Sequence, residues 1–215
     1  FGAAHAFLMV GGTTSSVQSM VLSSCKRGDE IILPRNVHKS VINALVLCGP
    51  VPVYVNPEVD QRLGISLGMK CEQVAKAIAE HPKAVAVLVN NPTYYGICSD
   101  LRAIVKMAHD AGMLCLVDEA HGTHFYFGSG LPVSAMEAGA DMASVSMHKS
   151  GGSLTQSSLL LTGPNIHAGY VRQIINLTQT TSGSYLLMSS LDISRRNLAL
   201  RGRKVFHQVA DMAEY

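Results

Sequence analysis

The sequence predicts an α/β fold in which a mainly parallel β-sheet is covered by helices on both faces. Its 215 residues suffice for one sizeable domain, and a composition of 47% apolar and 15% charged residues is rich in core formers. Short β-branched runs alternate with longer segments of helical period, which is typical of strand–helix–strand units. Runs such as 84–89 are apolar throughout, so we expect strands buried on both faces, none of them with a solvated face.

The expected elements alternate along the chain. Strands are predicted at residues 30–33, 51–55, 84–90, 113–118, 143–146 and 158–161. Helices are predicted at residues 15–24, 39–48, 71–80, 101–111 and 133–138. After Gly163 the pattern changes to two helices, 168–178 and from Tyr185 onward, with a break at 180–183. The basic residues of the last helix are expected on a solvated face: Arg195, Arg196, Arg201, Arg203 and Lys204.

Charge and cysteine content exclude several classes of protein. A formal net charge of +2 is too small for a nucleic-acid-binding surface, and the chain has no polybasic membrane tether. No apolar run of about eighteen residues is present to span a membrane. The 5 cysteines are odd in number and form no C-x-x-C pair, so neither a disulfide framework nor a zinc site is expected. These features favour a cytoplasmic location.

A loop rich in glycine and hydroxyl groups precedes the first predicted helix. It reads Gly11-Gly12-Thr13-Thr14-Ser15-Ser16. Glycines let the backbone approach an anion, and the first N–H groups of a helix are unpaired donors, so the loop is suited to a phosphate group. It is no Walker loop, because no Gly-Lys-Ser/Thr follows. A helix N-cap supplied by Thr13 or Thr14 is the alternative interpretation.

Three further polar clusters follow predicted strands, where ligands of parallel sheets bind. Asp118 ends an apolar strand, and a buried carboxylate needs a cationic or hydrogen-bonding partner; capping of the next loop is the alternative. Lys149 follows another strand and could serve as an amine nucleophile, although most lysines extend into solvent. His38 lies after the strand at 30–33, where a structural loop histidine is the alternative. Pyridoxal 5′-phosphate is one cofactor that would use all four clusters.

In their order along the chain, these motifs resemble the major domain of the Orn/Lys/Arg decarboxylase family. The resemblance covers essentially the whole chain, and it rests on Asn36-Val37-His38-Lys39-Ser40, Asp118-Glu119-Ala120-His121 and Ser146-Met147-His148-Lys149. Residues 154–158, 180–185 and 190–192 are also similar to the family. The family belongs to the fold type I, aspartate-aminotransferase-like pyridoxal-phosphate enzymes. The resemblance therefore implies a mainly parallel, seven-stranded type of sheet sandwiched by helices.

The resemblance implies roles for individual residues. Lys149 would be the Schiff-base lysine, Asp118 the partner of the ring nitrogen, and His38 the residue that stacks on the ring. The remaining expected cofactor-binding residues are Gly12, Thr13, Thr14, Ser15, Ala120, His121, Ser146 and His148. A hydroxyl around Thr180 would reach the phosphate of the neighbouring subunit's cofactor. Lys149 or His148 would supply the proton that completes the reaction, and the sequence does not choose between them.

The resemblance also implies an activity and an organisation. We expect a homodimer or larger homo-oligomer with a shared active site, which decarboxylates arginine, lysine or ornithine in polyamine biosynthesis. Glu119 is the one acidic residue beside the expected site that could receive the distal cation of such a substrate. Because the chain starts without Met and stops within a predicted helix, we expect it to be truncated at both ends. Residues 1–183 would form the cofactor-binding domain, and 184–215 would lead toward a further C-terminal domain.

Three alternatives remain at the level of sequence. A pyridoxal-phosphate aminotransferase or lyase would share Lys149 and Asp118. A nucleotide-binding module would place a diphosphate on residues 11–16, although the chain has no G-x-G-x-x-G after its first strand. A catalytically silent relative is the third, and retention of Lys149, His38 and Asp118 together argues against it.

Overall fold

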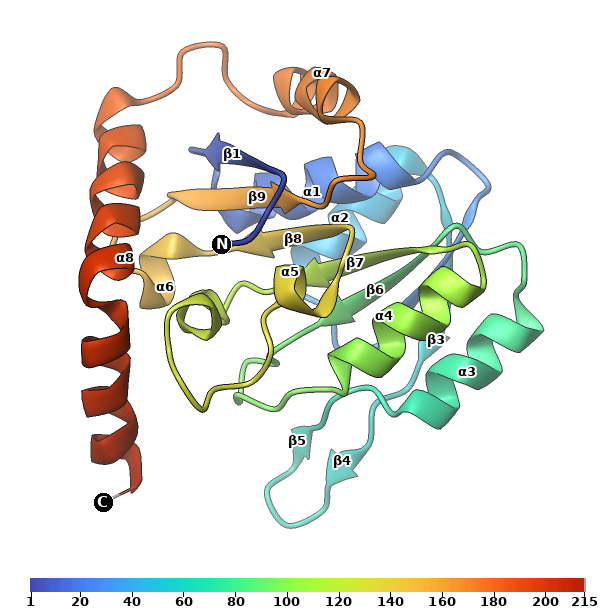
Figure 1. Cartoon of the computed structure of the whole chain (residues 1–215). Coiled ribbons are helices and arrows are strands. Elements are labelled where there is room, and N and C mark those ends of the chain that lie inside the picture. The colour runs from blue at the N-terminus through green and yellow to red at the C-terminus, as the bar shows by residue number, and fades with distance from the viewer. Residues whose placement is uncertain (215) are drawn as a thin grey trace.

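The apolar β-branched segments pair into one seven-stranded sheet, which confirms the predicted fold class (Figure 1). The computed structural model describes residues 1–214. The strand order is β1-β9-β8-β7-β6-β2-β3, and neighbours are parallel except at β9, which is antiparallel to β8 and β1. The strands are β1 (His5–Met9), β2 (Glu30–Pro34), β3 (Val51–Val55), β6 (Ala86–Asn90), β7 (Leu114–Asp118), β8 (Met142–Val145) and β9 (Ser158–Thr162).

Helices cover both faces of the sheet because alternate strand residues point to opposite sides. Ile31 and Leu33 join the core under α1, α2 and α7, whereas Ile32, between them, joins the core under the other helices. The helices are α1 (Gly12–Ser24), α2 (Lys39–Cys48), α3 (Cys71–Glu80), α4 (Leu101–Asp110), α5 (Ala135–Ala138), α6 (Met147–Ser150), α7 (Ala168–Thr178) and α8 (Tyr185–Glu214). A 3₁₀ turn, η1 (Thr123–Tyr126), follows β7.

Several predicted boundaries shift by one to three residues. Helix α1 begins at Gly12 rather than at residue 15, because Gly11 is its N-cap. The strand expected at 143–146 ends at Val145, since Ser146 is already the N-cap of α6, a short helix that the sequence did not reveal. Helix α5 begins two residues after the predicted 133, because Ser134 is extended. Strands β6 and β7 likewise begin later than the predicted 84 and 113.

Two features of the sheet depart from the sequence prediction. Strand β1 was not predicted; it is half exposed and pairs with β9, far along the chain, as in His5 opposite Thr162. The expectation that no strand has a solvated face is wrong for β3, where Val51 is 50% exposed, because β3 lies at the edge of the sheet. A small hairpin, β4 (Val59–Asp60) with β5 (Ile65–Ser66), extends away from the sheet (Figure 1).

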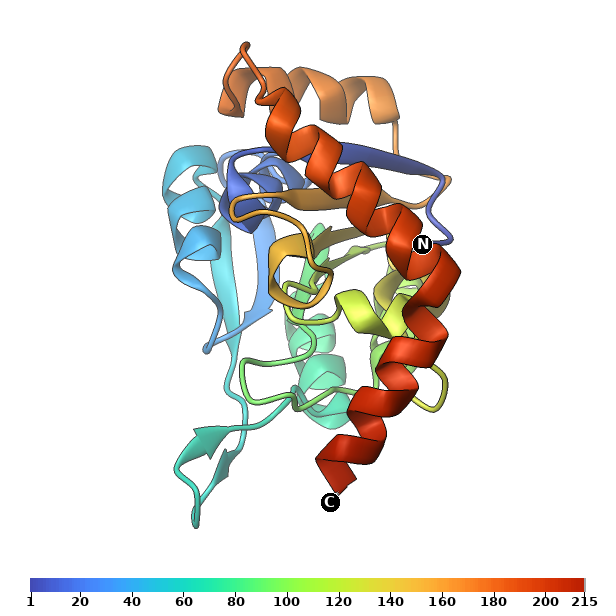
Figure 2. The ribbon, with the colours of Figure 1, turned by 90° about the vertical axis from the view of Figure 1, so that its left-hand side faces the viewer.

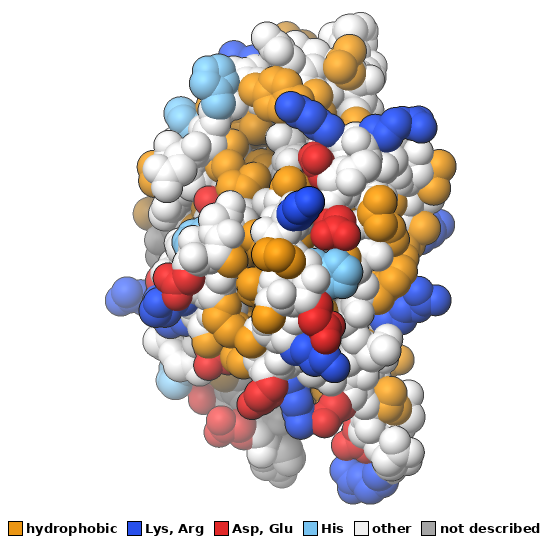
Figure 3. Space-filling model, turned by 90° about the vertical axis from the view of Figure 1, so that its right-hand side faces the viewer, with side chains coloured by type: hydrophobic (Ala, Val, Ile, Leu, Met, Phe, Trp, Pro, Cys, Tyr) orange, Lys and Arg blue, Asp and Glu red, His pale blue; other side chains and the backbone are white. Residues whose placement is uncertain are grey.

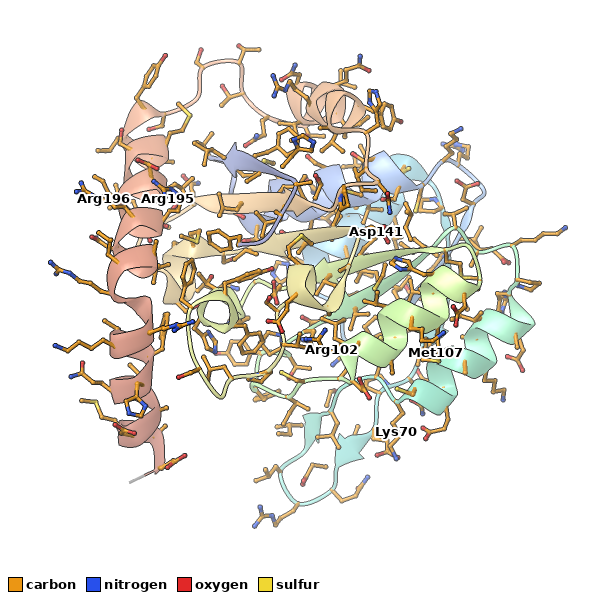
Figure 4. The ribbon with its side chains drawn as sticks, viewed as in Figure 1. Lys70, Arg102, Met107, Asp141, Arg195 and Arg196 are labelled. Carbon is orange, nitrogen blue, oxygen red and sulfur yellow. The ribbon has the colours of Figure 1, made fainter. Side chains whose placement is uncertain are left out.

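Helix α8 runs along one side of the molecule (Figure 2). Its buried residues recur every three or four positions, so a single stripe faces the core: Leu191, Ser194, Leu198 and Gly202. The basic residues predicted to be solvated are all exposed, and Figure 4 labels two of them, Arg195 and Arg196. The buried Oγ of Ser194 donates to the carbonyl of Gly151, which ties α8 to the loop after α6.

Most charged groups lie on the surface, and one buried carboxylate lies at an end of the sheet. Basic and acidic side chains are interspersed on the face shown in Figure 3. The buried carboxylate of Asp141, before β8, accepts the Cys115 N–H at 2.7 Å and contacts His109 Nε2 at 2.8 Å (Figure 4). Within residues 1–214, no helix combines the length and apolarity that crossing a membrane requires.

Candidate active site

The carboxyl ends of the parallel strands meet at one edge of the sheet, and a cavity of about 480 Å³ opens there. Strand β7 ends with Asp118, and β8 leads through Ser146 into α6, which carries Lys149. The residues that line the cavity come from six stretches of the chain: Gly11, Gly12, Thr13, Thr14, Asn36, His38, Ser40, Asn90, Tyr94, Asp118, Ala120, His121, Ser146, His148, Lys149, Thr155 and Gln156. The structure thus brings together the four clusters that the sequence singled out.

The N-terminus of α1 forms one wall of the cavity. The Gly12 N–H donates to the carbonyl of Gln156 at 2.8 Å, and the Gly11 N–H donates to Gln179 Oε1 at 3.2 Å. The next N–H groups of the helix, those of Thr13 and Thr14, have no helical acceptor. Gly12 has φ +73° with open space where a Cβ would stand, so the backbone itself is presented to the cavity.

One interpretation of the sequence made Thr13 or Thr14 the N-cap of this helix. The hydroxyl of Thr13 has other partners and does not cap the helix. Its Oγ1 bonds to Ser146 Oγ and lies 3.2 Å from Ser158 Oγ, and α1 has no side-chain cap. Residues of α1, β9 and the β8–α6 junction are thereby joined beside the cavity. Helix N–H groups and hydroxyls clustered in this way form a cradle for a phosphate group.

Asp118 lies at the floor of the cavity and is 3% exposed. Its Oδ1 accepts the Ala120 N–H at 3.3 Å, so it does cap the following loop while it lines the cavity. Burial raises the pKa of Asp118, although the Ala120 N–H and the nearby His38 and Lys149 partly oppose that rise. A buried carboxylate with so few partners favours a cationic group of a ligand beside it.

Lys149 faces the same cavity from α6. Its Nζ lies 3.0 Å from Nε2 of His121. Burial lowers the pKa of Lys149, with Asp118 opposing, so that the neutral, nucleophilic amine is more accessible than in an exposed lysine. Burial, reinforced by the charge of Lys149, lowers the pKa of His121 as well, which favours a neutral imidazole that can accept a hydrogen bond from the amine.

Two more histidines line the cavity. His38 is the N-cap of α2, where its Nδ1 accepts the Ser40 N–H at 3.2 Å and lies 2.9 Å from Ser40 Oγ. The structural interpretation of His38 is confirmed, and the functional one stays a prediction that the structure allows, because the cap fixes the orientation of a ring that faces the cavity. His148 lies beside Lys149, and burial, followed by the charge of Lys149, lowers its pKa.

Three residues expected at the site do not line the cavity. Ser15 is buried, and its Oγ has no hydrogen-bond partner among the described residues. Thr180 is exposed on the loop before α8, where its Oγ1 accepts the Ser182 N–H at 3.1 Å. Glu119, considered as a receptor for a substrate cation, points into the core instead and accepts bonds from Tyr126 Oη and from the Ala135 N–H.

Other lining residues were given no role by the sequence. Asn90 ends β6 at the same edge as Asp118, a position that the rule of strand ends could have revealed. Tyr94 lies in the loop after that strand, and Thr155 and Gln156 follow α6. Gln156 has φ +71°, a backbone conformation that residues other than glycine rarely adopt and that often marks functional sites. No sequence pattern signals that strained backbone.

Comparison with known proteins decides the family. The chain matches the family described as Orn/Lys/Arg decarboxylase, major domain, over residues 1–215. It belongs to this family. It is 48% identical to an arginine decarboxylase of Bacillus subtilis, with 99% of this chain and 44% of that protein aligned. An arginine decarboxylase of Bacillus cereus is also 48% identical, and there the alignment covers 100% of this chain and 47% of that protein.

The fold comparison agrees with the family. Lysine decarboxylase A from Pseudomonas aeruginosa superimposes with a TM-score of 0.89 at 24% identity, over 99% of this chain and 32% of that one. At this identity the likeness establishes the shared fold. The chain spans about half the length of the curated relatives that it matches.

The family identifies the cofactor as pyridoxal phosphate, and the cavity fits it. The cofactor has an anionic phosphate, an aldehyde and a ring nitrogen that can be protonated. The cavity offers the N-terminus of α1 for the phosphate and Lys149 for the aldehyde. The sparsely partnered Asp118 is available for the ring nitrogen. The ring of His38 completes a set that a nucleotide diphosphate would not require.

Proposed function

We propose that the protein decarboxylates a basic amino acid to the corresponding amine with pyridoxal phosphate as cofactor. One observation carries the proposal: a poised amine, Lys149, and a buried acid, Asp118, line the same cavity as an anion cradle. The relatives named arginine decarboxylase, at 48% identity, support arginine as the substrate among arginine, lysine and ornithine.

Each group at the site has a distinct task in this proposal. Lys149 holds the cofactor covalently, and Thr13, Thr14 and Ser146 bind its phosphate, with His148 beside them. Asp118 keeps the ring nitrogen protonated, because an opposite charge close by favours the charged form of its partner. When bound, the cofactor supplies an electron sink for the bond that breaks at the substrate α-carbon. His38 packs against its ring.

Proton transfer in the reaction falls to the residues around Nζ of Lys149. The lowered pKa of Lys149 favours its uncharged, reactive amine, and Nε2 of His121 at 3.0 Å orients that amine as a hydrogen-bond partner. After carbon dioxide leaves, a donor must return a proton to the α-carbon, and Lys149 and His148 both line the cavity for that purpose. Exclusion of bulk water by the buried floor around Asp118 strengthens these charge interactions.

The organisation of the whole protein follows the same proposal. The active unit is a homodimer or larger homo-oligomer with a shared site, located in the cytoplasm, and its amine product enters polyamine biosynthesis. Thr180 binds the phosphate of the partner's cofactor, consistent with its exposure outside this chain's own cavity. Residues 1–183 form the cofactor-binding domain, and the long helix α8 leads onward from it.

The test measures chemistry and cofactor attachment separately. The protein is incubated with L-arginine, L-lysine or L-ornithine, and released carbon dioxide is measured together with keto acid. Carbon dioxide from at least one substrate is expected, whereas keto acid without carbon dioxide would identify an aminotransferase. In parallel, Lys149→Ala should abolish the visible absorption of the covalently bound cofactor; a coloured adduct that persists in this variant would contradict the assignment of Lys149.

A further inference from the structure

A second cavity of about 350 Å³ adjoins the active site. The two cavities share Tyr94 and His121 in their walls. The second is lined otherwise by proline, glycine, hydroxyl, imidazole and phenyl groups: Pro92, Thr93, Gly96, His124, Phe125 and Pro132. No lysine, arginine or carboxylate is among the described residues that line it. Such a wall accepts a long side chain but offers no direct ion-pair partner for its tip.

Tyr94 and His121 form an aromatic ridge between the two cavities. Their ring centroids are 5.5 Å apart, with the planes at 85°. The Tyr94 side chain is 77% exposed, so a face of its ring is free for a ligand. The turn below it is fixed by bonds of the buried Thr93, which donates its N–H to Ile97 at 2.9 Å and accepts the Gly96 N–H at 3.0 Å. A ring that stands on an ordered turn and keeps a free face is suited to stacking.

The charges around the ridge do not oppose a cation. Burial lowers the pKa values of His121 and His124, so both imidazoles are neutral and do not repel positive charge. Glu119 packs against Gly122, the residue after His121: a Cβ on Gly122 would stand 2.5 Å from Cγ of Glu119 and 3.1 Å from Cδ of Pro92. Because burial raises the pKa of Glu119 to about 8, its carboxyl is mostly protonated at neutral pH, and the attraction for a cation at this place comes from the face of the Tyr94 ring.

We propose that Tyr94 is the specificity-determining residue that receives the guanidinium group of the substrate on its ring face. The inference rests on the proposed function, because the substrate amino group must approach Lys149, whose Nζ lies 3.0 Å from His121. A side chain that starts beside His121 and runs along the ridge reaches Tyr94. The planar guanidinium stacks on an aromatic face better than a compact ammonium does, which favours arginine over lysine.

The test compares three variants of the holoenzyme: Tyr94→Leu, Tyr94→Phe and Tyr95→Leu. Tyr95 is the matched control, since it is also exposed and contacts Tyr94 edge-on at 5.4 Å but lines neither cavity. L-Arginine is titrated against the visible absorption of the bound cofactor, and carbon dioxide release is measured in parallel. We expect Tyr94→Leu to weaken the affinity for L-arginine about tenfold. The affinities of the other two variants should stay within about twofold of the wild-type value.

The outcomes separate this inference from the proposed function. If carbon dioxide is not released but the titration still sets Tyr94→Leu apart, the proposed function fails and the role of Tyr94 stands. Normal carbon dioxide release with equal arginine affinities in all proteins overturns the role of Tyr94 alone. An equal loss in Tyr95→Leu or in Tyr94→Phe, or no response of the wild type to arginine, also overturns it.

Discussion

Asp118 and Glu119 are adjacent carboxyl groups at the end of β7 that point in opposite directions. Asp118 lines the cavity, whereas Glu119 is fully buried in the core between η1 and α5. Burial raises the pKa of both, and for Glu119 the value rises to about 8. Asp118 is the last residue of β7, and Glu119, just after it, is held in the core by Tyr126 and Ala135, so one acid is available to a ligand and the other to the fold.

For Asp118, the substitution Asp118→Asn should suppress catalysis without unfolding the protein. Asparagine can still accept the Ala120 N–H through its Oδ1 but carries no charge to hold a protonated ring nitrogen. We expect the rate of carbon dioxide release to fall about a hundredfold or more, as when a buried electrostatic partner is removed elsewhere. Initial rates at saturating cofactor measure this effect. Activity within about threefold of wild type, with cofactor bound, would contradict the role of Asp118.

For Glu119, the prediction concerns stability against pH. Its pKa is raised to about 8 in the folded state from an ordinary value of 4.5, so the folded state binds a proton that the unfolded chain lacks between these values. The contribution is complete at low pH and is lost as pH rises through that window, by up to about 1.4 kcal/mol per pH unit. Urea unfolding should therefore show wild-type stability falling from pH 5 to pH 8 more steeply than that of Glu119→Gln. Parallel pH profiles for the two proteins would refute the prediction.

At the scale of elements, α8 is held against the rest of the molecule by a close approach at Gly202. A Cβ at this position would stand 2.7 Å from Cβ of Phe127, which follows η1. Phe127 packs in turn on Phe1, with ring centroids 5.0 Å apart. The obstruction is a Cβ next to the backbone, not the end of a flexible chain, so it cannot move aside cheaply.

Gly202→Ala should therefore destabilise the protein, although alanine is the better helix former. Helix propensity favours alanine by about 1 kcal/mol, whereas overpacking typically costs about 1–3 kcal/mol. We expect a net loss of about 1 kcal/mol in the free energy of unfolding. The control is Asn197→Ala on the exposed face of α8, which should stabilise slightly. A gain in stability from Gly202→Ala equal to that of the control would show that α8 does not pack this closely.

At the scale of the whole molecule, the sequence predicts which reactive groups line the cavity better than it predicts how the chain arranges the residues around them. Lys149 and Asp118 were identified because reactive groups after apolar runs are visible in the sequence. The orientation of Glu119 could not be predicted, because its partners Tyr126 and Ala135 are brought to it by tertiary folding. Strand β1 was missed for a similar reason: it is short and half exposed, and only its distant partner β9 makes it a strand. The early start of α1 has no side-chain cap to reveal it.

The proposed sharing of the active site between two chains would be a property of the assembly, and hybrid dimers can test it. We expect Thr180→Val to weaken cofactor binding about tenfold or more, since a hydrogen bond to a charged phosphate is lost. In a dimer of one Lys149→Ala chain and one Thr180→Val chain, a site shared between chains leaves one site with both changes and the other intact. At limiting cofactor, carbon dioxide release per hybrid dimer should then be about half that of wild type. If each chain instead uses its own Thr180, no intact site remains, and the hybrid should show only half the activity of the Thr180→Val homodimer. Differently tagged chains, purified through both tags, provide the hybrid for this measurement.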